Sequence, residues 1–300
     1  MTQLISQIST GSFKALARAI SLVENKAGGY LEILMNLPVS SVSAVIGITG
    51  PPGAGKSTIT DALIGEIIAA GKKVGVVCVD PSSPFNFGAL LGDRIRMNRW
   101  YNHPDVFIRS LANRGSLGGL HPSIIEITDV MKAFGFDYII VETVGVGQSE
   151  VEIAGLADTT VIVLVPEAGD EVQTMKAGLM EIGDIFVVNK ADRPGADTFV
   201  KNLKQILYPS RHISSAEVPV VKTVADQNTG IDVLFEKIKS HLLLYKSNDK
   251  HSWLLTEKAY YLIQAKRMNN INKENLFKTI KAEIENGDTF NLYRFIEEFE

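Results

Sequence analysis

A glycine-rich loop between two apolar segments constrains the fold of this chain more than any other feature. It lies within VIGITGPPGAGKSTITDAL, residues 45–63, and satisfies the pattern G-x-x-x-x-G-K-[ST]. In that pattern a strand leads into the loop, a helix follows, backbone N–H groups surround phosphates, the lysine reaches the β- and γ-phosphates, and the hydroxyl ligates magnesium. Correct flanking segments disfavour a chance glycine-rich turn. The predicted nucleotide contacts of this phosphate loop (residues 50–57) and the next residue are Gly50, Gly53, Ala54, Gly55, Lys56, Ser57 and Thr58.

Short β-branched runs recur along the chain and predict a sheet. They span residues 43–50, 72–80, 105–112, 137–145, 159–166, 184–192 and 218–225. The runs are apolar without clean alternation, which is typical of strands buried on both faces of a parallel sheet. Segments with helical spacing lie between most of them, at 56–70, 119–134, 171–181 and 196–207. This alternation predicts an α/β fold with a doubly wound, mainly parallel sheet.

The chain is expected to have three parts. An N-terminal helical extension covers residues 1–40, a nucleotide-binding domain covers 41–248, and a helical tail covers 249–300. Within the extension, residues 11–35 have the pattern of an amphipathic helix. The tail has several aromatic and leucine side chains but too few to build a core of its own, so we expect it to pack against the main domain or a second copy of the chain.

Composition limits the classes of partner. A net charge of −4 over 300 residues gives no broad basic field for nucleic acid or an anionic membrane. Cys78 is the single cysteine, which excludes an intrachain disulfide. It lies in the apolar run VGVVCVD, which favours a buried thiol. The sequence has no apolar run of about eighteen residues and no secretory pattern at its start. We expect a cytoplasmic protein with protein or small-molecule partners, and no nucleic acid or membrane.

A second motif, NKAD at residues 189–192, indicates which base the bound nucleotide carries. Directly before it stands the apolar run DIFVV. An ionised aspartate only accepts hydrogen bonds, so Asp192 suits the two N–H donors on one edge of guanine, a donor pair that adenine lacks. N-K-x-D is also common in ordinary turns, but here it follows a strand, at the sheet edge where ligands bind in open α/β folds. The predicted nucleotides are GTP and GDP, bound with Mg²⁺.

Two carboxylates are candidates for the metal site. Asp80 ends the run VGVVCVD and Glu142 ends DYIIVE, so both can face the terminal phosphate from the same edge of the sheet. Hard oxygen ligands of this kind are what octahedral Mg²⁺ accepts, directly or through water. Asp80 precedes PSSP, and its alternative role is to cap the turn or helix that follows.

The segment ETVGVGQSE, residues 142–150, is expected to move with the state of the nucleotide. Gly145 and Gly147 let the backbone approach a terminal phosphate and relax when it leaves. Gln148 can orient the attacking water, or it is a loop amide that faces solvent. Both interpretations of Gln148 stay open from the sequence.

The order of these motifs resembles one known family. GPPGAGKST, VDPSSP, GDRIRM, VETVGVGQSE and PEAGDEVQTMKAGLMEIGDIFVVNKAD together are similar to the MeaB/ArgK family of P-loop GTPases, over roughly residues 11 to 245. Members of that family are G-protein chaperones of adenosylcobalamin-dependent acyl-CoA mutases, chiefly methylmalonyl-CoA mutase. Older names describe them as kinases of a lysine/arginine/ornithine transport system. The resemblance implies that this chain is a homodimer with such a mutase as its partner.

The resemblance also assigns residues. It implies that Asn189, Lys190 and Asp192 hold guanine, and that Asp93 of GDRIRM joins the metal neighbourhood of Ser57, Asp80 and Glu142. It implies that GDEVQTMK, residues 169–176, is an additional switch that brings Lys176 near the nucleotide. At KTVA, residues 222–225, the family usually has a Ser-Ala pair over the base, so Val224 and Ala225 are expected to offer backbone contacts. The tail after residue 250 does not closely resemble the family's dimerisation arm.

The leading interpretation is a GTP-hydrolysing chaperone, slow without its partner, that couples its cycle to cofactor loading or protection of a mutase. The candidate catalytic residues are Lys56, Glu142, Gln148 and Lys176. A metallochaperone-type GTPase is one alternative; it needs metal ligands, and the five isolated histidines and one cysteine suggest no site. A protein kinase linked to amino-acid transport is another; it needs an acceptor pocket and a base, and the sequence nominates neither.

Overall fold

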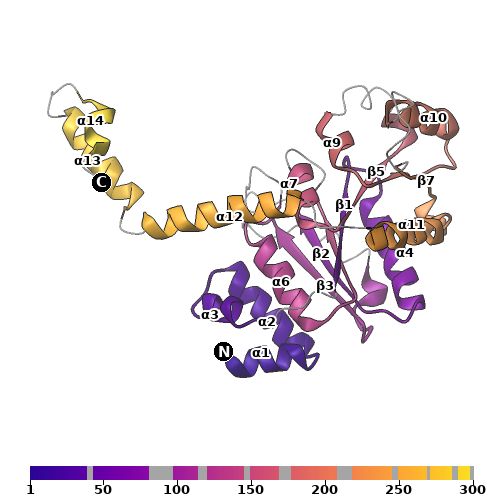
Figure 1. The fold of residues 1–300 in the computed structure, drawn as a ribbon, viewed down its shortest axis with the longest axis horizontal. Coiled ribbons are helices and arrows are strands. Elements are labelled where there is room, and N and C mark those ends of the chain that lie inside the picture. Colours follow the sequence, from indigo (N-terminus) through magenta and orange to yellow (C-terminus); the bar gives the residue numbers. More distant parts are fainter. Residues whose placement is uncertain are drawn as a thin grey trace. The chain divides into compact units, whose positions relative to one another are not determined.

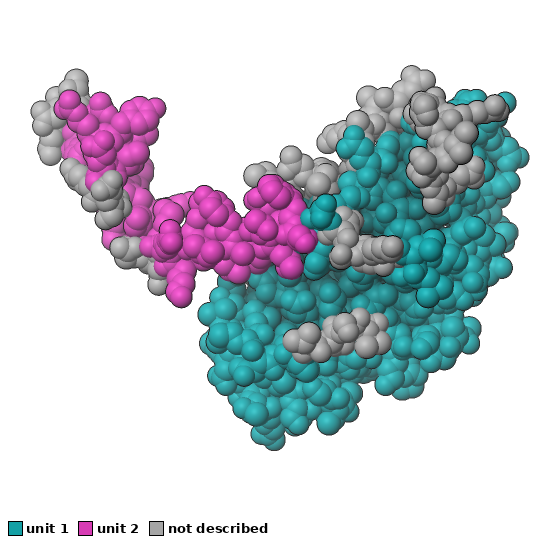
Figure 2. Space-filling view, viewed as in Figure 1, with its two compact units in different colours: residues 1–251 teal, residues 252–300 magenta. Residues whose placement is uncertain are grey.

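The chain forms two compact units in the computed structural model (Figure 2). Unit 1 is Met1–His251 and unit 2 is Ser252–Glu300. The structure describes residues 1–38, 43–80, 97–113, 120–144, 149–168, 177–207, 218–244, 249–268, 271–285 and 290–297. The sheet lies in unit 1, together with every predicted site residue that falls in these ranges.

Unit 1 is built on a seven-stranded parallel sheet with the order β3-β2-β4-β1-β5-β6-β7 (Figure 1). The strands are β1 (Ala44–Thr49), β2 (Val74–Asp80), β3 (Val106–Ala112), β4 (Tyr138–Glu142), β5 (Thr159–Leu164), β6 (Ile185–Val188) and β7 (Val220–Lys222). Each lies inside one of the seven apolar runs, so the predicted α/β fold and its parallel sheet are confirmed. The central strand β1 pairs with β4 in a register that sets Ile48 opposite Glu142. The end of β4 therefore lies beside the start of the phosphate loop.

Helices cover both faces of the sheet. In unit 1 they are α1 (Thr2–Ser9), α2 (Phe13–Glu24), α3 (Tyr30–Met35), α4 (Lys56–Ala69), α6 (Ile124–Phe134), α7 (Ser149–Leu156), α9 (Ala177–Ile182), α10 (Ala196–Leu207) and α11 (Ile231–Leu244). On one face α4 and α11 bury the sheet side chains, and on the other α7, α9 and α10 cover β5 and β6 (Figure 1). The remaining helices are α12 (Asp249–Arg267), which begins in unit 1, and α13 (Lys273–Glu285) and α14 (Leu292–Glu297) in unit 2.

The N-terminal helices pack onto unit 1 through an aromatic cluster and an ion pair. The ring of Phe13 stacks on Phe134 with centroids 5.1 Å apart. Arg109 of β3 reaches back to Glu24 of α2, with its Nη2 atom 2.5 Å from the carboxylate Oε2, and both side chains are largely buried. An arginine–carboxylate contact that is partly desolvated is stronger than an exposed one. These contacts hold α2 against β3 and α6.

The prediction of one helix over residues 11–35 is wrong. The structure has two helices in that range, and α2 ends at Glu24 while α3 begins at Tyr30. Gly29, which stands before α3, has a φ angle of +86°, a left-handed conformation that glycine adopts without strain. The chain therefore turns between Glu24 and Tyr30, through Lys26 and Gly29, which both have positive φ angles. Helix α1 lies inside the predicted N-terminal helical extension, although no separate helix had been expected before residue 11, and the predicted helical character of the tail is confirmed by α12, α13 and α14.

Every helix in the described ranges is too short or too polar to span a bilayer. Cys78 is buried, as expected.

Close packing of α7 on β1 depends on the absence of a side chain at Gly47. A methyl group at this position would lie 2.6 Å from Ile153 Cγ1 and 3.0 Å from Ala157 Cβ. These distances are shorter than van der Waals contact, so either the helix or the strand has to move. Gly47 thus fixes how near α7 lies to the strand that carries the phosphate loop.

We predict that Gly47→Ala lowers the free energy of unfolding by about 1–3 kcal/mol, the usual cost of overpacking a core. Gly28→Ala is the matched control, because a methyl group at position 28 meets nothing within 4 Å. In this control the free energy of unfolding should either fall by less than about 0.5 kcal/mol or rise. Guanidinium denaturation of both variants measures the difference. Equal stabilities for the two variants would contradict the packing argument.

Candidate nucleotide-binding site

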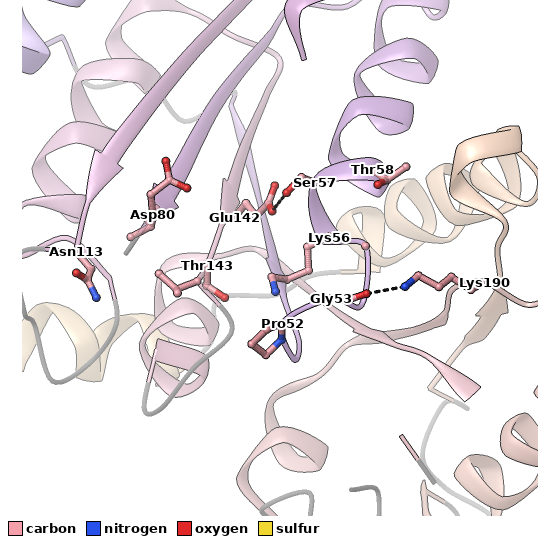
Figure 3. Close-up of a pocket in the computed structure, with 13 residues that line it drawn as sticks. Pro52, Gly53, Lys56, Ser57, Thr58, Asp80, Asn113, Glu142, Thr143 and Lys190 are labelled. Atoms are coloured by element: carbon pink, nitrogen blue, oxygen red, sulfur yellow. Dashed lines mark hydrogen bonds between the residues drawn. The ribbon is translucent and has the colours of Figure 1, made fainter. Parts of the chain in front are cut away.

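A cavity of about 580 Å³ opens at the carboxyl edge of the sheet, a volume that suits a small-molecule ligand (Figure 3). The predicted site residues that line it are Gly53, Gly55, Lys56, Ser57, Thr58, Asp80, Glu142 and Lys190. Pro52, Val79, Asn113, Thr143 and Val144 line it as well and were not predicted. The structure thus brings the phosphate loop and both candidate metal carboxylates to one cavity.

Lys56 is the first residue of α4, and its side chain turns back over the phosphate loop. Its Nζ atom donates to the carbonyl oxygens of Gly50, at 2.9 Å, and Pro51, at 3.1 Å. The side chain is buried, so the loop carbonyls and the cavity surround the ammonium group. A cation next to the N-terminal end of a helix makes this part of the cavity favourable for anions. This is the chemistry that a phosphate chain requires.

Two hydroxyl groups of α4 hold the carboxylate of Glu142. Ser57 Oγ donates to Oε1 at 2.6 Å, and Thr60 Oγ1 donates to Oε2 at 2.8 Å (Figure 3 shows the first contact). Glu142 is only 3% exposed. Both carboxylate oxygens therefore accept a hydrogen bond, which satisfies a polar group that is removed from water. The end of β4 therefore brings an oriented carboxyl group to the wall of the cavity.

The donor set fits Mg²⁺. Ser57, Asp80 and Glu142 supply hard oxygen atoms around the same cavity, and Asp80 is buried at the end of β2. Within the described ranges no three His, Cys, Asp or Glu side chains are grouped to hold a metal ion. One hydroxyl and two carboxylates at one cavity suit Mg²⁺, which keeps several waters and takes one or two carboxylates together with substrate phosphates. The alternative role of Asp80 as a cap concerns residues 81–84, which lie outside the described ranges.

Thr143 anchors the chain as it leaves β4. Its backbone N–H donates to the carbonyl of Ile48 at 3.0 Å, and its hydroxyl donates to Thr49 Oγ1 at 2.8 Å. Thr49 and Thr143 are both buried. The residue after Glu142 is thus bound to the strand that leads into the phosphate loop, so the relative positions of Glu142 and the loop are determined by short contacts.

Asn189 connects the NKAD motif to the phosphate loop. Its Nδ2 atom donates to the carbonyl of Ala54 at 2.9 Å, and its Oδ1 atom accepts from Ala225 N at 3.2 Å and from Thr223 Oγ1 at 3.1 Å. Gly55 has a φ angle of +91°, and a methyl group there would lie 2.3 Å from Asn189 Nδ2. The second glycine of the loop pattern is therefore required by the neighbouring asparagine as well as by its own backbone conformation.

Lys190 makes a second contact between the two motifs. Its Nζ atom donates to the carbonyl of Gly53 at 2.8 Å (Figure 3). Lys190 itself has a φ angle of +55°, which turns the chain directly after Asn189. Together, Asn189 and Lys190 bind three consecutive residues of the phosphate loop region, since Gly55 packs against the amide.

The remaining base-side residues lie apart from the cavity lining. Asp192 is exposed, whereas Val224 and Ala225 are buried and the N–H of Ala225 donates to Asn189. Next to Asp192, Arg193 forms an ion pair with Glu167, which follows β5, and the hydrogen bond from Arg193 lowers the pKa of Glu167. The loop that carries Asp192 is in this way attached to the end of β5.

Three predicted residues, Asp93, Gln148 and Lys176, lie outside the described residues. Among the residues that the sequence reasoning missed, Asn113 and Thr60 could have been found from the sequence. Asn113 follows β3 and donates its N–H to the carbonyl of Asp80 at 2.9 Å. The rule that ligands bind at the carboxyl ends of parallel strands would have identified Asn113. The helical spacing of Thr60 from Lys56 and Ser57 would have placed its hydroxyl on the same side of α4.

The fold and the cavity define a P-loop nucleotide-binding protein. The family model described as methylmalonyl Co-A mutase-associated GTPase MeaB matches residues 16–283. The chain belongs to this MeaB family of GTPases, as the sequence resemblance indicated.

Named relatives agree with that family. A putative GTPase of Pyrococcus abyssi is 53% identical over 80% of this chain and 75% of its own length. The GTPase ArgK of Escherichia coli is 39% identical over 64% of this chain and 60% of its own length. A fused isobutyryl-CoA mutase of Geobacillus kaustophilus is 33% identical over 87% of this chain, which corresponds to 27% of that much longer protein.

Solved structures agree with the fold. A protein described as LAO/AO transport system kinase superposes with a TM-score of 0.69 at 26% identity, covering 99% of this chain and 96% of its own. HypB from Helicobacter pylori, solved in complex with nickel, superposes with a TM-score of 0.50 at 16% identity, over 78% of this chain and 98% of its own. At that identity the second likeness concerns the fold alone.

We predict that Asn189→Ala lowers the free energy of unfolding by about 1–3 kcal/mol, because it leaves the buried N–H of Ala225 without its acceptor. The matched control is Asn36→Ala, since the Asn36 amide makes an exposed hydrogen bond to the Glu32 carbonyl. The control should cost less than about 0.5 kcal/mol. Urea denaturation without added nucleotide measures both. A wild-type unfolding midpoint for Asn189→Ala would contradict the structural role of this amide.

Proposed function

We propose that this chain binds GTP with Mg²⁺, hydrolyses it to GDP and phosphate, and couples this cycle to an adenosylcobalamin-dependent acyl-CoA mutase. The observation that carries the nucleotide part is the direct attachment of the NKAD motif to the phosphate loop through Asn189 and Lys190. That attachment supports a single ligand that extends from one motif to the other. GTP has a base for Asp192 and a phosphate chain for Lys56.

Each residue has a role in this proposal. Lys56 binds the β- and γ-phosphates and stabilises the charge that develops there during hydrolysis. Ser57, Asp80 and Glu142 hold Mg²⁺, and Asp93 joins them by family resemblance. The metal ion neutralises charge on the phosphates when it is bound. Gln148 and Lys176 remain candidates for orienting water and for adding a cation, and both assignments rest on the resemblance and the sequence.

The mutase part of the proposal rests on the relatives. A protein named fused isobutyryl-CoA mutase includes a segment that is 33% identical to 87% of this chain. Fusion of a family member to a mutase supports a functional contact between the two activities. For this chain we propose a separate mutase, with methylmalonyl-CoA mutase as the first candidate, and a nucleotide cycle that loads or protects its cobalamin cofactor.

The oligomeric state and the division into parts stay proposals too. We propose a homodimer, an N-terminal extension over 1–40, a GTPase domain over 41–248 and a tail over 249–300. Among the described residues, α12 has no buried side chain although it carries Trp253, Tyr260 and Tyr261. Aromatic side chains that their own unit does not bury support a contact with a further surface, which we propose to be that of a second copy of the chain. Sedimentation velocity of the full chain tests the dimer. The protein is proposed to act in the cytoplasm.

We predict that Asp192→Asn lowers the affinity for GTP and raises that for xanthosine triphosphate. The new amide N–H opposes the N–H donors of guanine but can donate to the 2-oxo group of xanthine. Loss of one such partner costs about 1–3 kcal/mol, or roughly 5- to 150-fold in affinity. Asp232→Asn, an exposed aspartate on α11, is the charge-matched control. Equal affinity of wild type for ATP and GTP, or unchanged GTP affinity in Asp192→Asn, would refute guanine recognition.

We predict that a purified adenosylcobalamin-dependent acyl-CoA mutase raises the slow GTP turnover of this protein. Coupling of binding is reciprocal, so the complex should be about 5- to 150-fold tighter with one nucleotide state than with the other. Calorimetry with a GTP analogue, with GDP and without nucleotide measures that factor.

Lys56→Ala is the low-activity reference for this GTPase assay, because loss of one charge-stabilising group lowers kcat by about 10²- to 10³-fold. Lys72→Ala, which removes an exposed lysine paired with Asp137, is the matched control and should keep wild-type turnover. If the mutase changes neither turnover nor affinity in any nucleotide state, the partner is wrong. The GTPase assignment fails only if wild-type protein alone does not hydrolyse GTP, or if Lys56→Ala does not lower kcat relative to wild type.

A further inference from the structure

Thr60 lies behind the predicted metal site and is not assigned a role by the phosphate-loop pattern. It is fully buried on α4, four residues after Lys56 and three after Ser57. Its hydroxyl lies 2.8 Å from Glu142 Oε2 and 3.0 Å from the carbonyl oxygen of Lys56. A hydroxyl group has one proton to donate, and a carboxylate is a stronger acceptor than a neutral carbonyl, so the proton is directed to Glu142 and the Lys56 carbonyl is the weaker, secondary acceptor. The contact with Glu142 crosses from the helix to the end of β4 and joins a hydroxyl to a carboxylate.

The geometry at Glu142 explains why a second hydroxyl matters. The terminal torsion of a glutamate side chain has a broad, two-fold distribution, so one hydrogen bond leaves the carboxylate plane free to turn. Ser57 holds Oε1 and Thr60 holds Oε2, and both donors belong to the same rigid helix. Two contacts on the two oxygens fix the plane of the carboxylate. Hydrogen bonds to a charged acceptor are also stronger than those between neutral groups.

The orientation of Glu142 in turn decides how Ser57 presents its oxygen. While Ser57 donates its O–H to Glu142 Oε1, it offers an oxygen acceptor, and not a proton, as a ligand for a cation in the cavity that both residues line. If the carboxylate turns away, the Ser57 proton has to find another acceptor and the hydroxyl oxygen loses that orientation. Residues that orient a metal ligand in this way affect metal affinity without touching the metal.

We propose that Thr60 is a positioning residue for the Mg²⁺ site, and that its hydroxyl fixes the Glu142 carboxylate and, through it, the Ser57 oxygen. This inference rests on the proposed binding of GTP and GDP with Mg²⁺ and adds to it a residue that determines cation affinity. The role belongs to the hydroxyl and not to the size of the side chain. This dependence on the hydroxyl distinguishes Thr60 from a threonine that only fills space in a helix.

The test uses three variants and a control from elsewhere in the chain. Thr60→Val keeps the shape and removes the hydroxyl, Thr60→Ser keeps the hydroxyl, and Thr60→Ala removes the hydroxyl without a branched side chain should the valine variant not fold. Thr128→Val is the matched control. Thr128 is equally buried on α6, and its hydroxyl donates to the Ile124 carbonyl at 2.8 Å, the carbonyl four residues earlier, which is where the Lys56 carbonyl lies relative to Thr60.

The readout is the Mg²⁺ concentration at which binding of a fluorescent GDP analogue is half-restored after EDTA treatment, with unfolding free energies measured in parallel without nucleotide. We expect Thr60→Val and Thr60→Ala to raise this concentration by about 10- to 100-fold, the usual effect of losing a group that orients a metal ligand. Thr60→Ser should stay within about 3-fold of wild type, a margin below that expected effect. Thr128→Val should lose stability without any change in the Mg²⁺ requirement.

Two kinds of failure are distinguishable. If wild-type protein binds no guanine nucleotide, the proposed function fails and this inference fails with it. If wild-type protein binds GDP with a Mg²⁺ requirement that Thr60→Val and Thr60→Ala share, the inference alone is overturned. It is overturned as well if Thr60→Ser is as impaired as Thr60→Val, or if Thr128→Val shifts the requirement equally, because the effect would then follow from packing and not from the hydroxyl.

Discussion

The buried amide of Asn189 is the interaction on which the rest of the candidate site depends. It donates to the carbonyl of Ala54 on the phosphate loop and accepts from Ala225 and Thr223 on the loop after β7. Only a side chain with both a donor and an acceptor can serve both neighbours, and an aspartate of the same size would have no donor to offer. One residue thereby determines the distance between the part of the site suited to phosphate and the part suited to a base.

The sequence predicts the sheet well because of how a parallel sheet is buried. Strands covered on both faces appear as short apolar runs, and all seven are visible in the sequence without reference to partners. The phosphate loop is equally local, since its whole pattern lies between a strand and the helix that follows. The hydroxyls that hold Glu142 are not local. Thr60 is 82 residues from Glu142 in the sequence, and their contact depends on the pairing of β1 with β4 and on the rotation of α4.

Short elements account for most of what the sequence did not reveal. Helices α1 and α7 have eight residues each, too few for the apolar repeat of a helix to stand out. The break between α2 and α3 includes Gly29, whose left-handed φ angle of +86° interrupts a pattern that otherwise continues. The residues on the base side of the site were predicted from the sequence motif alone. The hydrogen bond from the N–H of Ala225 to Asn189 could not be predicted in this way, because it depends on the path of the backbone after β7.

The attachment of α2 to β3 has a consequence for how the chain is made. Glu24 and its partner Arg109 are 85 residues apart, and Phe13 packs on a ring that lies further along still. During synthesis the N-terminal helices leave the ribosome before the surface that covers them exists, and at roughly 5–20 residues per second they wait for several seconds. Their apolar faces are exposed for that time, so the N-terminal helices cannot reach their final environment until β3 and α6 have been made.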